Sequence, residues 1–454
     1  MLSVIILAAG QGTRMRSALP KVLHVLADRP LLEHVIDTAE QIGADDIHVV
    51  YGHGGQVVPT TLAHRTVAWV MQAQQLGTGH AVAQALPDIN PGNQVLILYG
   101  DVPLVSVETL ETLLKSAAND GFGLLTVTLT DASGYGRIIR DKSGAVTRIV
   151  EHKDATEQER QVNEVNTGIL SVSSDRLNVW LKRLDNNNVQ GEYYLTDIIA
   201  MAVQEGLTIS TVSSGDENEV LGVNNKRQLA TLERYYQQLQ ADRLMDAGVT
   251  LRDPLRFDLR GVITCGRDVI IDVNVILTGN VTLGNNVNIG PNCMISNSTI
   301  GDDVTILANS VIDEAVVGSG SRIGPFARLR PETVLAEETH IGNFVEIKKA
   351  TIGKGSKVNH LSYVGDARVG KGVNIGAGTI TCNYDGANKY LTEIGDNVFV
   401  GSDTQLIAPV KIGDGVTIGA GSTITKDVEP DVLALSRSKQ QTITGWKRPV
   451  KKNR

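Results

Sequence analysis

The sequence predicts a two-part fold: an α/β Rossmann-like domain, a linking helix, and a parallel β-helix built from hexapeptide repeats. Residues 1–222 alternate short β-rich runs with amphipathic helical patterns, which indicates a mostly parallel sheet covered on both faces. After about Gly261, aliphatic residues recur every six positions instead. The 454 residues include 46 Gly, above the usual ~7%, but only 5 Phe, 10 Tyr and 3 Trp.

The first part, residues 1–224, is expected to form one domain with its own core. Strands are expected at Val4–Leu7, Ile47–Tyr51, Val95–Tyr99, Leu124–Leu129 and Gly168–Val172. Apolar residues at helical spacing between Leu31 and Ile42 predict one helix, and Ser106 is placed to cap another that runs to Ala118.

A long polar helix is expected next, from Asn225 to Ala247. Its sparse apolar residues are Leu229, Leu232, Tyr236, Leu239 and Leu244. We interpret residues 225–247 as a connecting arm between two domains, with an ordinary surface helix of the first domain as the alternative.

Residues 248–454 carry the six-residue repeat and a C-terminal tail. In each repeat an aliphatic residue is expected to point inward, Gly often follows it, and a small or β-branched residue comes four positions after it. The aliphatic positions are Leu283, Ile289, Ile295, Ile300, Ile306, Ile312, Val317, Ile323, Leu329, Leu335, Ile341, Ile347, Ile352, Val358, Val364, Val369, Ile375, Ile394, Val400, Leu406, Ile412, Ile418 and Ile424. A register held this long is the hexapeptide signature of a parallel β-helix.

Three six-residue faces make one triangular coil, and stacked coils bury a continuous aliphatic column. We expect glycine at the corners, where the backbone conformation often requires it. Large rings do not fit a narrow column, which explains the few aromatics. Cys293 lies in the inward register and is expected to be a small core residue. Residues Cys382–Asn388 interrupt the period and are expected to leave the column as an exposed loop.

Composition excludes several classes of protein. With 42 basic and 50 acidic residues, the net charge of −8 provides no basic footprint for nucleic acid. Three scattered cysteines imply neither a disulfide framework nor a zinc site, so we expect a reducing, cytoplasmic location. No run approaches 18 apolar residues, and Val4–Leu7 lacks a basic flank, so neither a membrane span nor a signal peptide is expected.

A glycine-rich turn, Ala8–Met15, follows the first expected strand and indicates an anion-binding site. Backbone N–H groups in such a turn can approach an anion, and Arg14 and Lys21 can neutralise phosphate charge. The turn is neither a Walker P-loop nor a clean dinucleotide fingerprint, because no Gly-Lys-Ser/Thr closes it and Met15 occupies the third Gly position. On spacing alone, a tight βα turn without a ligand stays open as an alternative.

A carboxylate is expected near this turn. Asp101 follows the strand candidate Val95–Tyr99, so it would lie at the carboxyl edge of a parallel sheet, where ligands of open α/β folds bind. It is a natural Mg²⁺ ligand beside phosphates.

These residues resemble the sugar-nucleotide pyrophosphorylases, whose signature is Leu-x-x-Gly-x-Gly-Thr-Arg-Met followed by Pro-Lys. Residues Leu7–Met15 and Pro20-Lys21 match it position by position. With the hexapeptide region behind them, Ser3 to Pro449 are similar to the bacterial bifunctional N-acetylglucosamine-1-phosphate uridylyltransferase/glucosamine-1-phosphate N-acetyltransferase family. The resemblance implies a nucleotidyltransferase domain and a left-handed β-helix.

The same resemblance implies two reactions that supply cell-wall and lipopolysaccharide precursors. Acetyl would pass from acetyl-CoA to glucosamine 1-phosphate, and UMP would then pass from UTP to N-acetylglucosamine 1-phosphate, giving UDP-N-acetylglucosamine and pyrophosphate. The cofactor implied is Mg²⁺, with acetyl-CoA and UTP as co-substrates.

Site residues of the first domain are also implied by the resemblance. Arg14 and Lys21 would stabilise the transferring and leaving phosphates. Asn224 would complete the Mg²⁺ site with Asp101, although a helix N-cap is an alternative role for it. The nucleotide and sugar would be held by Leu7, Ala8, Ala9, Gly10, Lys21, Gln72, Gly77, Thr78, Tyr99, Gly100, Asp101, Gly136, Glu151, Asn166 and Asn224.

His360 is the candidate base of the second domain. It falls outside the inward register set by Val358 and Ser362, so it faces solvent or a neighbouring subunit. A neutral imidazole suits removal of a proton from an attacking amine, although a lone histidine is equally an ordinary surface residue. The resemblance implies that it is catalytic in a homotrimer whose active sites lie between adjacent columns.

The resemblance further assigns two sets of binding residues in the β-helix. Those for glucosamine 1-phosphate are Arg330, Lys348, Tyr363 and Asn374, and those for acetyl-CoA are Ala377, Asn383, Tyr384, Ser402, Ala420 and Arg437. The basic end, 446–454, would screen coenzyme A phosphates or be a solvated tail.

Two other functions compete with this one. A chain with only the nucleotidyltransferase active would use the β-helix as an oligomerising or regulatory module, and His360 with Lys348 and Tyr363 argues against it. A non-catalytic β-helix scaffold would not need the cluster of Gly12–Arg14, Lys21 and Asp101.

Overall fold

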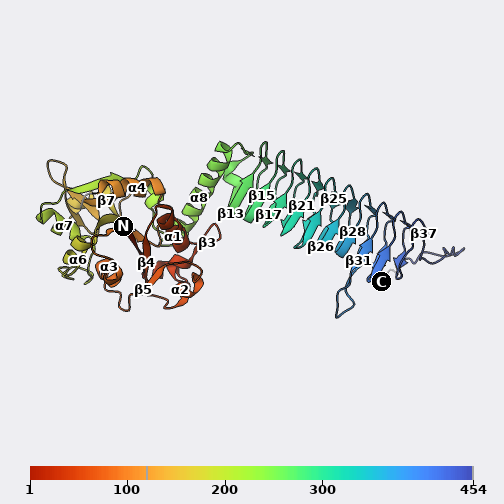
Figure 1. Ribbon diagram of the computed structural model, residues 1–454, viewed down its shortest axis with the longest axis horizontal. Helices are drawn as coiled ribbons and strands as arrows, with labels where there is room; N and C mark the ends of the chain where they lie inside the picture. The colour runs from red at the N-terminus through yellow and green to blue at the C-terminus, as the bar shows by residue number, and fades with distance from the viewer. Residues whose placement is uncertain (119–120, 452–454) are drawn as a thin grey trace. The chain divides into compact units, whose positions relative to one another are not determined.

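The computed structural model describes residues 1–118 and 121–451, and they form two compact units, Met1–Tyr236 and Gln237–Arg454 (Figure 1). We call them the α/β unit and the β-helix unit. The division into domains 1–224, 225–247 and 248–454 stays a prediction. None of the described helices is long and apolar enough to cross a membrane. Residues 452–454 of the basic end lie outside the described residues.

The α/β unit contains one mixed sheet, as its β-rich runs predict. Its strands are β1 (Leu2–Ala8), β4 (Asp46–Tyr51), β5 (Ala68–Met71), β6 (Gln94–Tyr99), β7 (Phe122–Thr128), β8 (Arg137–Arg140), β9 (Val146–Val150), β10 (Glu164–Ser173) and β11 (Ile209–Ser213), with a separate pair β2 (Val25–Leu26) and β3 (Arg29–Pro30). The main order is β11-β7-β10-β6-β1-β4-β5. All neighbours on this path pair in parallel except β10, which runs antiparallel to β6 and β7.

Helices cover both faces of this sheet. They are α1 (Leu31–Gln41), α2 (Val57–Thr61), α3 (Thr78–Ala85), α4 (Val107–Ser116), α5 (Glu157–Arg160), α6 (Ser174–Leu181) and α7 (Asp197–Gln204), with 3₁₀ turns η1 (Thr13–Met15), η2 (Lys21–Leu23), η3 (Leu86–Asp88) and η4 (Glu217–Val220). Leucines of α1 and α4 share one core layer, and residues of α3, α6 and α7 share the other. Ser106 caps α4, accepting a 3.1 Å hydrogen bond from the Thr109 amide, so that predicted start is confirmed.

Helix α8 (Lys226–Asp246) matches the predicted long polar helix within one residue at each end. Leu232, near its start, packs with Met15 and Val223 of the α/β unit. Ala241 and Leu244, near its end, belong to the apolar column of the β-helix unit.

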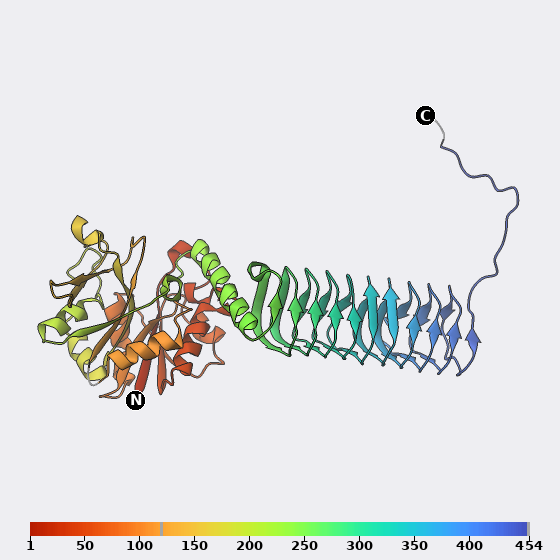
Figure 2. The same cartoon turned by 90° about the horizontal axis from the view of Figure 1, so that it is seen from above.

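The β-helix unit is a left-handed stack of three-sided coils, seen from above in Figure 2. One sheet holds β12 (Thr250–Leu251), β14 (Ile270–Ile271), β16 (Asn288–Ile289), β19 (Thr305–Ile306), β22 (Arg322–Ile323), β25 (His340–Asn343), β27 (Lys357–His360), β29 (Asn374–Ile375), β32 (Phe399–Val400), β35 (Thr417–Ile418) and β37 (Leu433–Ala434). The 3₁₀ turn η5 (Pro254–Arg256) precedes the strands of the other faces.

The other two faces form a second sheet, because long strands such as β15 and β26 run round the corner between them. Its strands are β13 (Phe257–Cys265), β15 (Val275–Leu283), β17 (Met294–Ser296), β18 (Thr299–Ile300), β20 (Val311–Asp313), β21 (Ala315–Val317), β23 (Arg328–Leu329), β24 (Thr333–Leu335), β26 (Glu346–Ile352), β28 (Tyr363–Val369), β30 (Ile380–Cys382), β31 (Thr392–Ile394), β33 (Gln405–Ile407), β34 (Val410–Ile412) and β36 (Thr423–Ile424). Every pair is parallel, and one coil takes 17 residues between Ile289 and Ile306 and 18 between Ile323 and Ile341.

The predicted inward register is confirmed throughout. Each aliphatic position given above is at most 5% exposed, and Cys293 is fully buried among them. The aromatic exclusion has one exception, because Phe257 at the start of β13 is 1% exposed and packs in the column.

The prediction about corner glycines is confirmed three residues after the inward aliphatic, as at Gly320 and Gly355 with φ +70°, but is wrong for most glycines that follow the aliphatic directly. Gly318, directly after Val317, has an ordinary φ, but a Cβ there would lie 2.5 Å from the backbone of Ala336 in the next coil. The left-handed conformation falls two residues later, where φ is +70° at Gly320 and +58° at Asp303 of the preceding coil. Glycine therefore follows the aliphatic residue because successive coils stack closely, and Asn or Asp often serves at the corner itself.

The predicted loop is present, with slightly different ends. Cys382 completes β30, and residues 384–390 are exposed. Tyr384 and Lys389 form an antiparallel bridge within the loop, which projects from the coils near β31 in Figure 1.

Candidate functional site

The glycine-rich turn lies at the carboxyl end of β1. Gly12 has φ +62°, and a Cβ on it would lie 2.7 Å from the Cβ of Lys21. Only glycine fits both the backbone conformation and this approach. The turn therefore brings Lys21 of η2 against the residues that follow β1.

Four polar side chains meet beside this turn. Lys21 Nζ contacts Asp101 Oδ2 and lies 3.4 Å from Asn224 Oδ1, which also accepts a 2.9 Å hydrogen bond from Arg14. The backbone amide of Val223 donates to the Asp101 carbonyl at 2.9 Å, which fixes the two segments together.

The alternative role of Asn224 as a helix N-cap is wrong. Its neighbour Asn225 caps α8, because Asn225 Oδ1 accepts hydrogen bonds of 3.0 Å from the amides of Arg227 and Gln228. The Asn224 amide oxygen faces the Lys21 and Arg14 cations instead.

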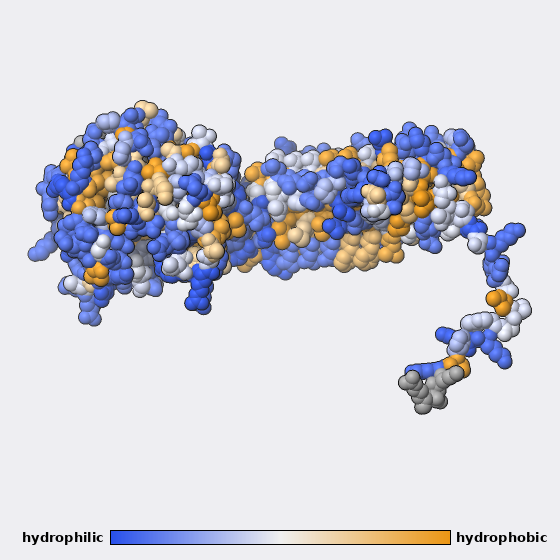
Figure 3. All heavy atoms as spheres, turned by 90° about the horizontal axis from the view of Figure 1, so that it is seen from below, coloured by the Kyte–Doolittle hydropathy of each residue, from blue (hydrophilic) through white to orange (hydrophobic). Residues whose placement is uncertain are grey.

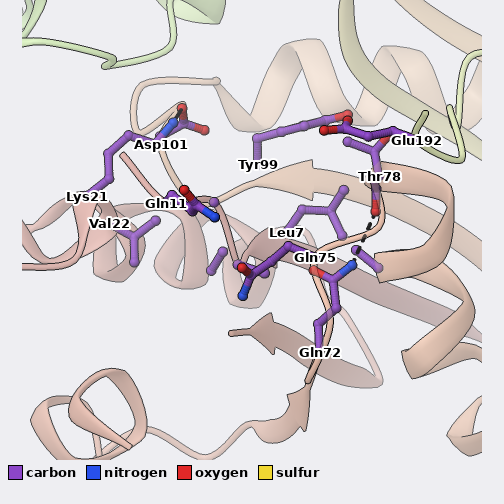
Figure 4. Close-up of a pocket in the computed structure, with 15 residues that line it drawn as sticks. Leu7, Gln11, Lys21, Val22, Gln72, Gln75, Thr78, Tyr99, Asp101 and Glu192 are labelled. Atoms are coloured by element: carbon purple, nitrogen blue, oxygen red, sulfur yellow. Dashed lines mark hydrogen bonds and ion pairs between the residues drawn. The ribbon is translucent and has the colours of Figure 1, made fainter. Parts of the chain in front are cut away.

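A cavity of about 500 Å³ opens next to this cluster. Figure 4 shows Lys21 and Asp101 at one end of it and Gln72 and Thr78 at the other. Predicted residues that line it are Leu7, Ala8, Ala9, Gly10, Lys21, Gln72, Gly77, Thr78, Tyr99 and Asp101. Residues that sequence reasoning did not assign are Gln11, Val22, Gln75, Ala81 and Glu192.

Sequence position explains which lining residues were missed. Gln11, Val22 and Gln75 lie inside or next to the assigned motifs, so including whole motifs would have found them. Glu192 carries no such signal: it belongs to an irregular segment that reaches the cavity because Gly79 donates to the Tyr193 carbonyl at 2.9 Å.

The resemblance assigns Gly136, Glu151 and Asn166 to the sugar, and the last two lie near Tyr99. A Cβ on Gly168 would lie 2.4 Å from the Tyr99 ring, and the Gly168 amide donates to Asn166 Oδ1 at 2.9 Å. A Cβ on Gly136 would lie 3.5 Å from a Glu151 oxygen. Gly100, between Tyr99 and Asp101, is held by a 3.0 Å hydrogen bond from its amide to the Leu7 carbonyl.

Burial perturbs two titratable groups here. It raises the pKa of Glu151, and the Asp197, Asp154 and Glu192 charges add to this, while a 3.0 Å hydrogen bond from Thr196 opposes it. Burial likewise raises the pKa of the Tyr99 hydroxyl, helped by the charges of Glu151 and Asp101. Tyr99 therefore stays neutral and can donate a hydrogen bond.

The donor set fits a magnesium ion shared with phosphate. Asp101 and Asn224 direct a carboxylate and an amide oxygen to one place, and oxygen donors are what Mg²⁺ prefers. Among the described residues no three His, Cys, Asp or Glu side chains gather as a metal site. Two protein oxygens suffice for Mg²⁺ when water and phosphate oxygens complete its shell.

In the β-helix, one edge carries His360 and most of the predicted acetyl-CoA residues. Asn343 pairs with His360 on the next coil, and His360 Nδ1 lies 2.8 Å from Asn343 Oδ1. Ala377, Ser402 and Ala420 hold the same position, two residues after an inward aliphatic, on the following coils. Arg437 donates to the Ala420 carbonyl at 2.9 Å, so all five predicted residues lie along this edge.

A second polar group lies on the neighbouring face. Arg330 and Lys348 follow the paired Leu329 and Ile347, and Arg330 bonds Glu346 at 2.8 Å. Tyr363 lies over Gly365, where a Cβ would come 2.2 Å from its hydroxyl. Asn383 donates to the Tyr363 hydroxyl at 3.3 Å, which ties the projecting loop to this face.

Lys389 is a member of this group that sequence reasoning missed. The Lys348 ammonium lowers the pKa of Lys389, while Asp366 and Tyr363 oppose that shift. The two ammonium groups therefore repel each other on this face, which also carries the Asp366 carboxylate.

Of the remaining predicted residues of the second site, Asn374 lies apart from this group, whereas Tyr384 forms the loop's bridge with Lys389. Asn374 is on β29, paired with Lys357 and Phe399, and Tyr384 is 59% exposed on the loop. Across the described part of the chain, no hydrogen bond joins His360 to Lys348, Tyr363 or Asn374.

Comparisons with known proteins match separate parts of the chain to different families. Residues 4–163 match a MobA-like NTP transferase domain, residues 259–352 a GMPPB C-terminal domain, and residues 391–426 six repeats of the bacterial transferase hexapeptide. The bifunctional protein GlmU of Cellvibrio japonicus is 59% identical over 453 residues, covering 100% of both chains. That of Methylococcus capsulatus is 60% identical over 448 residues, covering 98% of this chain and 97% of its own. The chain belongs to the bifunctional GlmU family.

Proposed function

We propose that the α/β unit transfers UMP from UTP to N-acetylglucosamine 1-phosphate, and that the β-helix unit acetylates glucosamine 1-phosphate with acetyl-CoA. The chain is a bifunctional transferase, and the product of the second unit is the substrate of the first. One observation carries the first assignment: Arg14, Lys21, Asp101 and Asn224 converge beside the glycine-rich turn and its cavity.

Phosphoryl chemistry of this type needs positioning and positive charge more than a covalent group. An oxygen of the sugar phosphate attacks the α-phosphorus of UTP, the new P–O bond forms, and the bond to pyrophosphate breaks. Arg14 and Lys21 balance the charge on the transferring and leaving phosphates. Asp101 and Asn224 would hold Mg²⁺, which supplies further charge neutralisation. Neutral Tyr99 and the buried Glu151 would orient the sugar hydroxyls by hydrogen bonds.

Acetyl transfer depends on which nitrogen of His360 carries the proton. Asn343 Oδ1 is an acceptor, so the proton belongs on Nδ1 and the lone pair is on Nε2. The amine of glucosamine 1-phosphate attacks the thioester carbonyl, a C–N bond forms, and the C–S bond breaks. His360 Nε2 takes the amine proton, and coenzyme A leaves as a thiolate that is then protonated.

The cationic face suits the other end of this substrate. Arg330 and Lys348 can hold the dianionic phosphate, leaving the amine uncharged for attack. Asn383 and Tyr384 on the loop, together with Ala377, Ser402, Ala420 and Arg437 along the edge, would line the path of acetyl-CoA.

We propose a homotrimer as the active form. Phe326 and Phe344 stack at 5.2 Å on one corner, and Leu361 follows them on the next coil. These three side chains are 49%, 55% and 62% exposed, and apolar residues lie on the surface of the β-helix in Figure 3. Exposed apolar ridges of this kind favour a partner surface. A solution mass measurement tests this, with a monomer at catalytic concentration as the contrary result.

We place the enzyme in the cytoplasm, where UTP and acetyl-CoA are made. Its three cysteines are free thiols, as a reducing compartment requires.

A paired assay tests both activities. Coenzyme A release is measured with glucosamine 1-phosphate and acetyl-CoA, and pyrophosphate release with UTP and N-acetylglucosamine 1-phosphate. We expect both in the full chain, with chelation of divalent metal removing pyrophosphate release and sparing coenzyme A release. A chain with pyrophosphate release alone would make the β-helix only an oligomerising module.

A further inference from the structure

The strongest unassigned arrangement is the hydrogen-bond chain behind Gln72. Gln72 lines the cavity but is only 3% exposed, so its amide is held rather than free to rotate. Its Nε2 lies 3.2 Å from the Gly77 carbonyl and 2.9 Å from His80 Nδ1. Figure 4 draws the first of these bonds as a dashed line.

The Gly77 carbonyl shows which way round the Gln72 side-chain amide lies. A carbonyl oxygen only accepts, so the amide atom next to it is the nitrogen of Gln72 and not the oxygen. That nitrogen donates its second hydrogen to His80 Nδ1, which must then be an unprotonated acceptor. A neutral imidazole accepts at only one nitrogen, and the Gln72 contact at 2.9 Å is shorter than the 3.3 Å between His80 Nε2 and Gln84 Nε2, so we place the imidazole proton on Nε2. Gln84 Nε2 donates instead to the His80 carbonyl at 3.4 Å.

With its nitrogen engaged twice, Gln72 has only its carbonyl oxygen left for a ligand in the cavity. That oxygen accepts a hydrogen bond from a base that presents an N–H on its pairing edge. Uracil has such a donor at N3, whereas N3 of cytosine is an acceptor and would meet the Gln72 oxygen unfavourably.

We infer that His80 is a specificity-determining residue. By holding the Gln72 amide with its oxygen toward the ligand, His80 makes the enzyme select uracil over cytosine nucleotides. His80 does not touch the nucleotide and acts through Gln72, so it is a positioning residue. The inference rests on the proposed uridylyl transfer.

The test compares UTP with CTP as substrate for the full-length enzyme. His80→Leu removes one of the two acceptors, so we expect the ratio of kcat/KM for UTP to that for CTP to fall about tenfold, the size of one lost hydrogen bond. The change should lie in KM, with kcat for UTP kept, because base contacts act equally before and during the reaction. His80→Gln, whose amide oxygen restores an acceptor, should recover part of the ratio.

His64→Leu is the matched control, because His64 is an exposed histidine of the same unit that pairs with Glu33 at 3.0 Å. It should leave the ratio unchanged, and acetyl transfer by the β-helix unit should be unaffected in every variant. A His80→Leu enzyme that loses UTP and CTP activity equally, or keeps the ratio, overturns the inference. A parent enzyme without any preference for UTP would instead overturn the proposed function.

A measurement on the unmodified protein covers the case in which His80→Leu does not fold. Imidazole ¹⁵N chemical shifts, with the His80 signal assigned by His80→Gln, should report the Nε2–H tautomer. A proton on Nδ1 would contradict the inferred orientation of Gln72.

Discussion

The two units differ in how their site residues are distributed along the sequence. In the α/β unit the site residues come from segments far apart in sequence, from the turn after β1 to Asn224 before α8, and they meet at the carboxyl ends of parallel strands. In the β-helix unit, His360 and the edge residues sit at one fixed offset from the buried aliphatics, coil after coil.

This difference predicts which substitutions should disturb each site. In the α/β unit a single fold brings distant loops together, so distant changes can displace the cluster. In the β-helix the inward residue of each repeat stabilises and the outward one is free to bind. Adjacent residues in one strand should therefore differ sharply in what their loss costs.

The largest effect is expected at His360. His360→Ala should lower the rate of acetyl transfer about 10²–10⁴-fold, because it removes the general base. Pyrophosphate release should stay at the parent level. Asn343→Ala should give a smaller loss of acetyl transfer, since it frees the imidazole tautomer without removing the base; a loss as large as that of His360→Ala would mean that Asn343 acts directly.

The next largest effect distinguishes an inward from an outward position by making the same change, valine to alanine, at two neighbouring residues. Val317 is 1% exposed and its strand neighbour Val316 is 47% exposed. Val317→Ala should destabilise the β-helix unit by about 2 kcal/mol, through two lost methyl groups and a small cavity. Val316→Ala should change it by less than about 0.5 kcal/mol. Hydrogen exchange of the β-helix amides measures both, and equal effects would contradict the inward register.

Two glycines of one corner separate stacking from backbone conformation. Gly318→Ala should cost about 1–3 kcal/mol, because its Cβ would meet the next coil at 2.5 Å. Gly320→Asn should cost less than about 1 kcal/mol, because Asn286 holds a positive φ of +55° at the same corner. Calorimetric unfolding of the two variants tests this order, and the reverse order would restore the corner explanation for glycine after the aliphatic.

The smallest effect is a pH dependence in the α/β unit. The pKa of Glu151 is raised in the folded state, so the folded chain binds this proton more tightly than the unfolded chain. Its contribution to stability is therefore fully present below pH about 4.5, the ordinary glutamate value, and is lost as the pH rises through the raised pKa. Glu151→Gln lacks this proton equilibrium. The melting temperature of the parent relative to Glu151→Gln should fall as the pH rises; a flat difference would show that Glu151 is not perturbed.

Much of the fold follows from repetition in the sequence. The inward column could be predicted residue by residue, because the aliphatic position of the repeat recurs about twenty times in the same role. Each coil then makes the same kind of contact with the next. The reason why glycine follows the aliphatic residue could not be predicted. Close stacking of coils and a positive φ both select glycine, so the sequence does not distinguish them.

The candidate site of the α/β unit was predictable only where it lies in a motif. The turn residues and Asp101 follow recognisable strands, whereas Glu192 reaches the cavity through the Gly79–Tyr193 hydrogen bond of an irregular segment. The Gln72 amide nitrogen lies 3.2 Å from the Gly77 carbonyl and 2.9 Å from His80 Nδ1, contacts that no spacing rule specifies.

The central claim is that one chain carries two independent sites, and mixing two inactive variants tests it most directly. Asp101→Ala should lose pyrophosphate release alone, and His360→Ala coenzyme A release alone. Neither variant by itself should convert glucosamine 1-phosphate, acetyl-CoA and UTP to UDP-N-acetylglucosamine. An equal mixture of the two should restore the whole conversion, because the acetylated intermediate passes through solution from one variant to the other. Folded variants that each lose both activities, and a mixture that stays inactive, would contradict it.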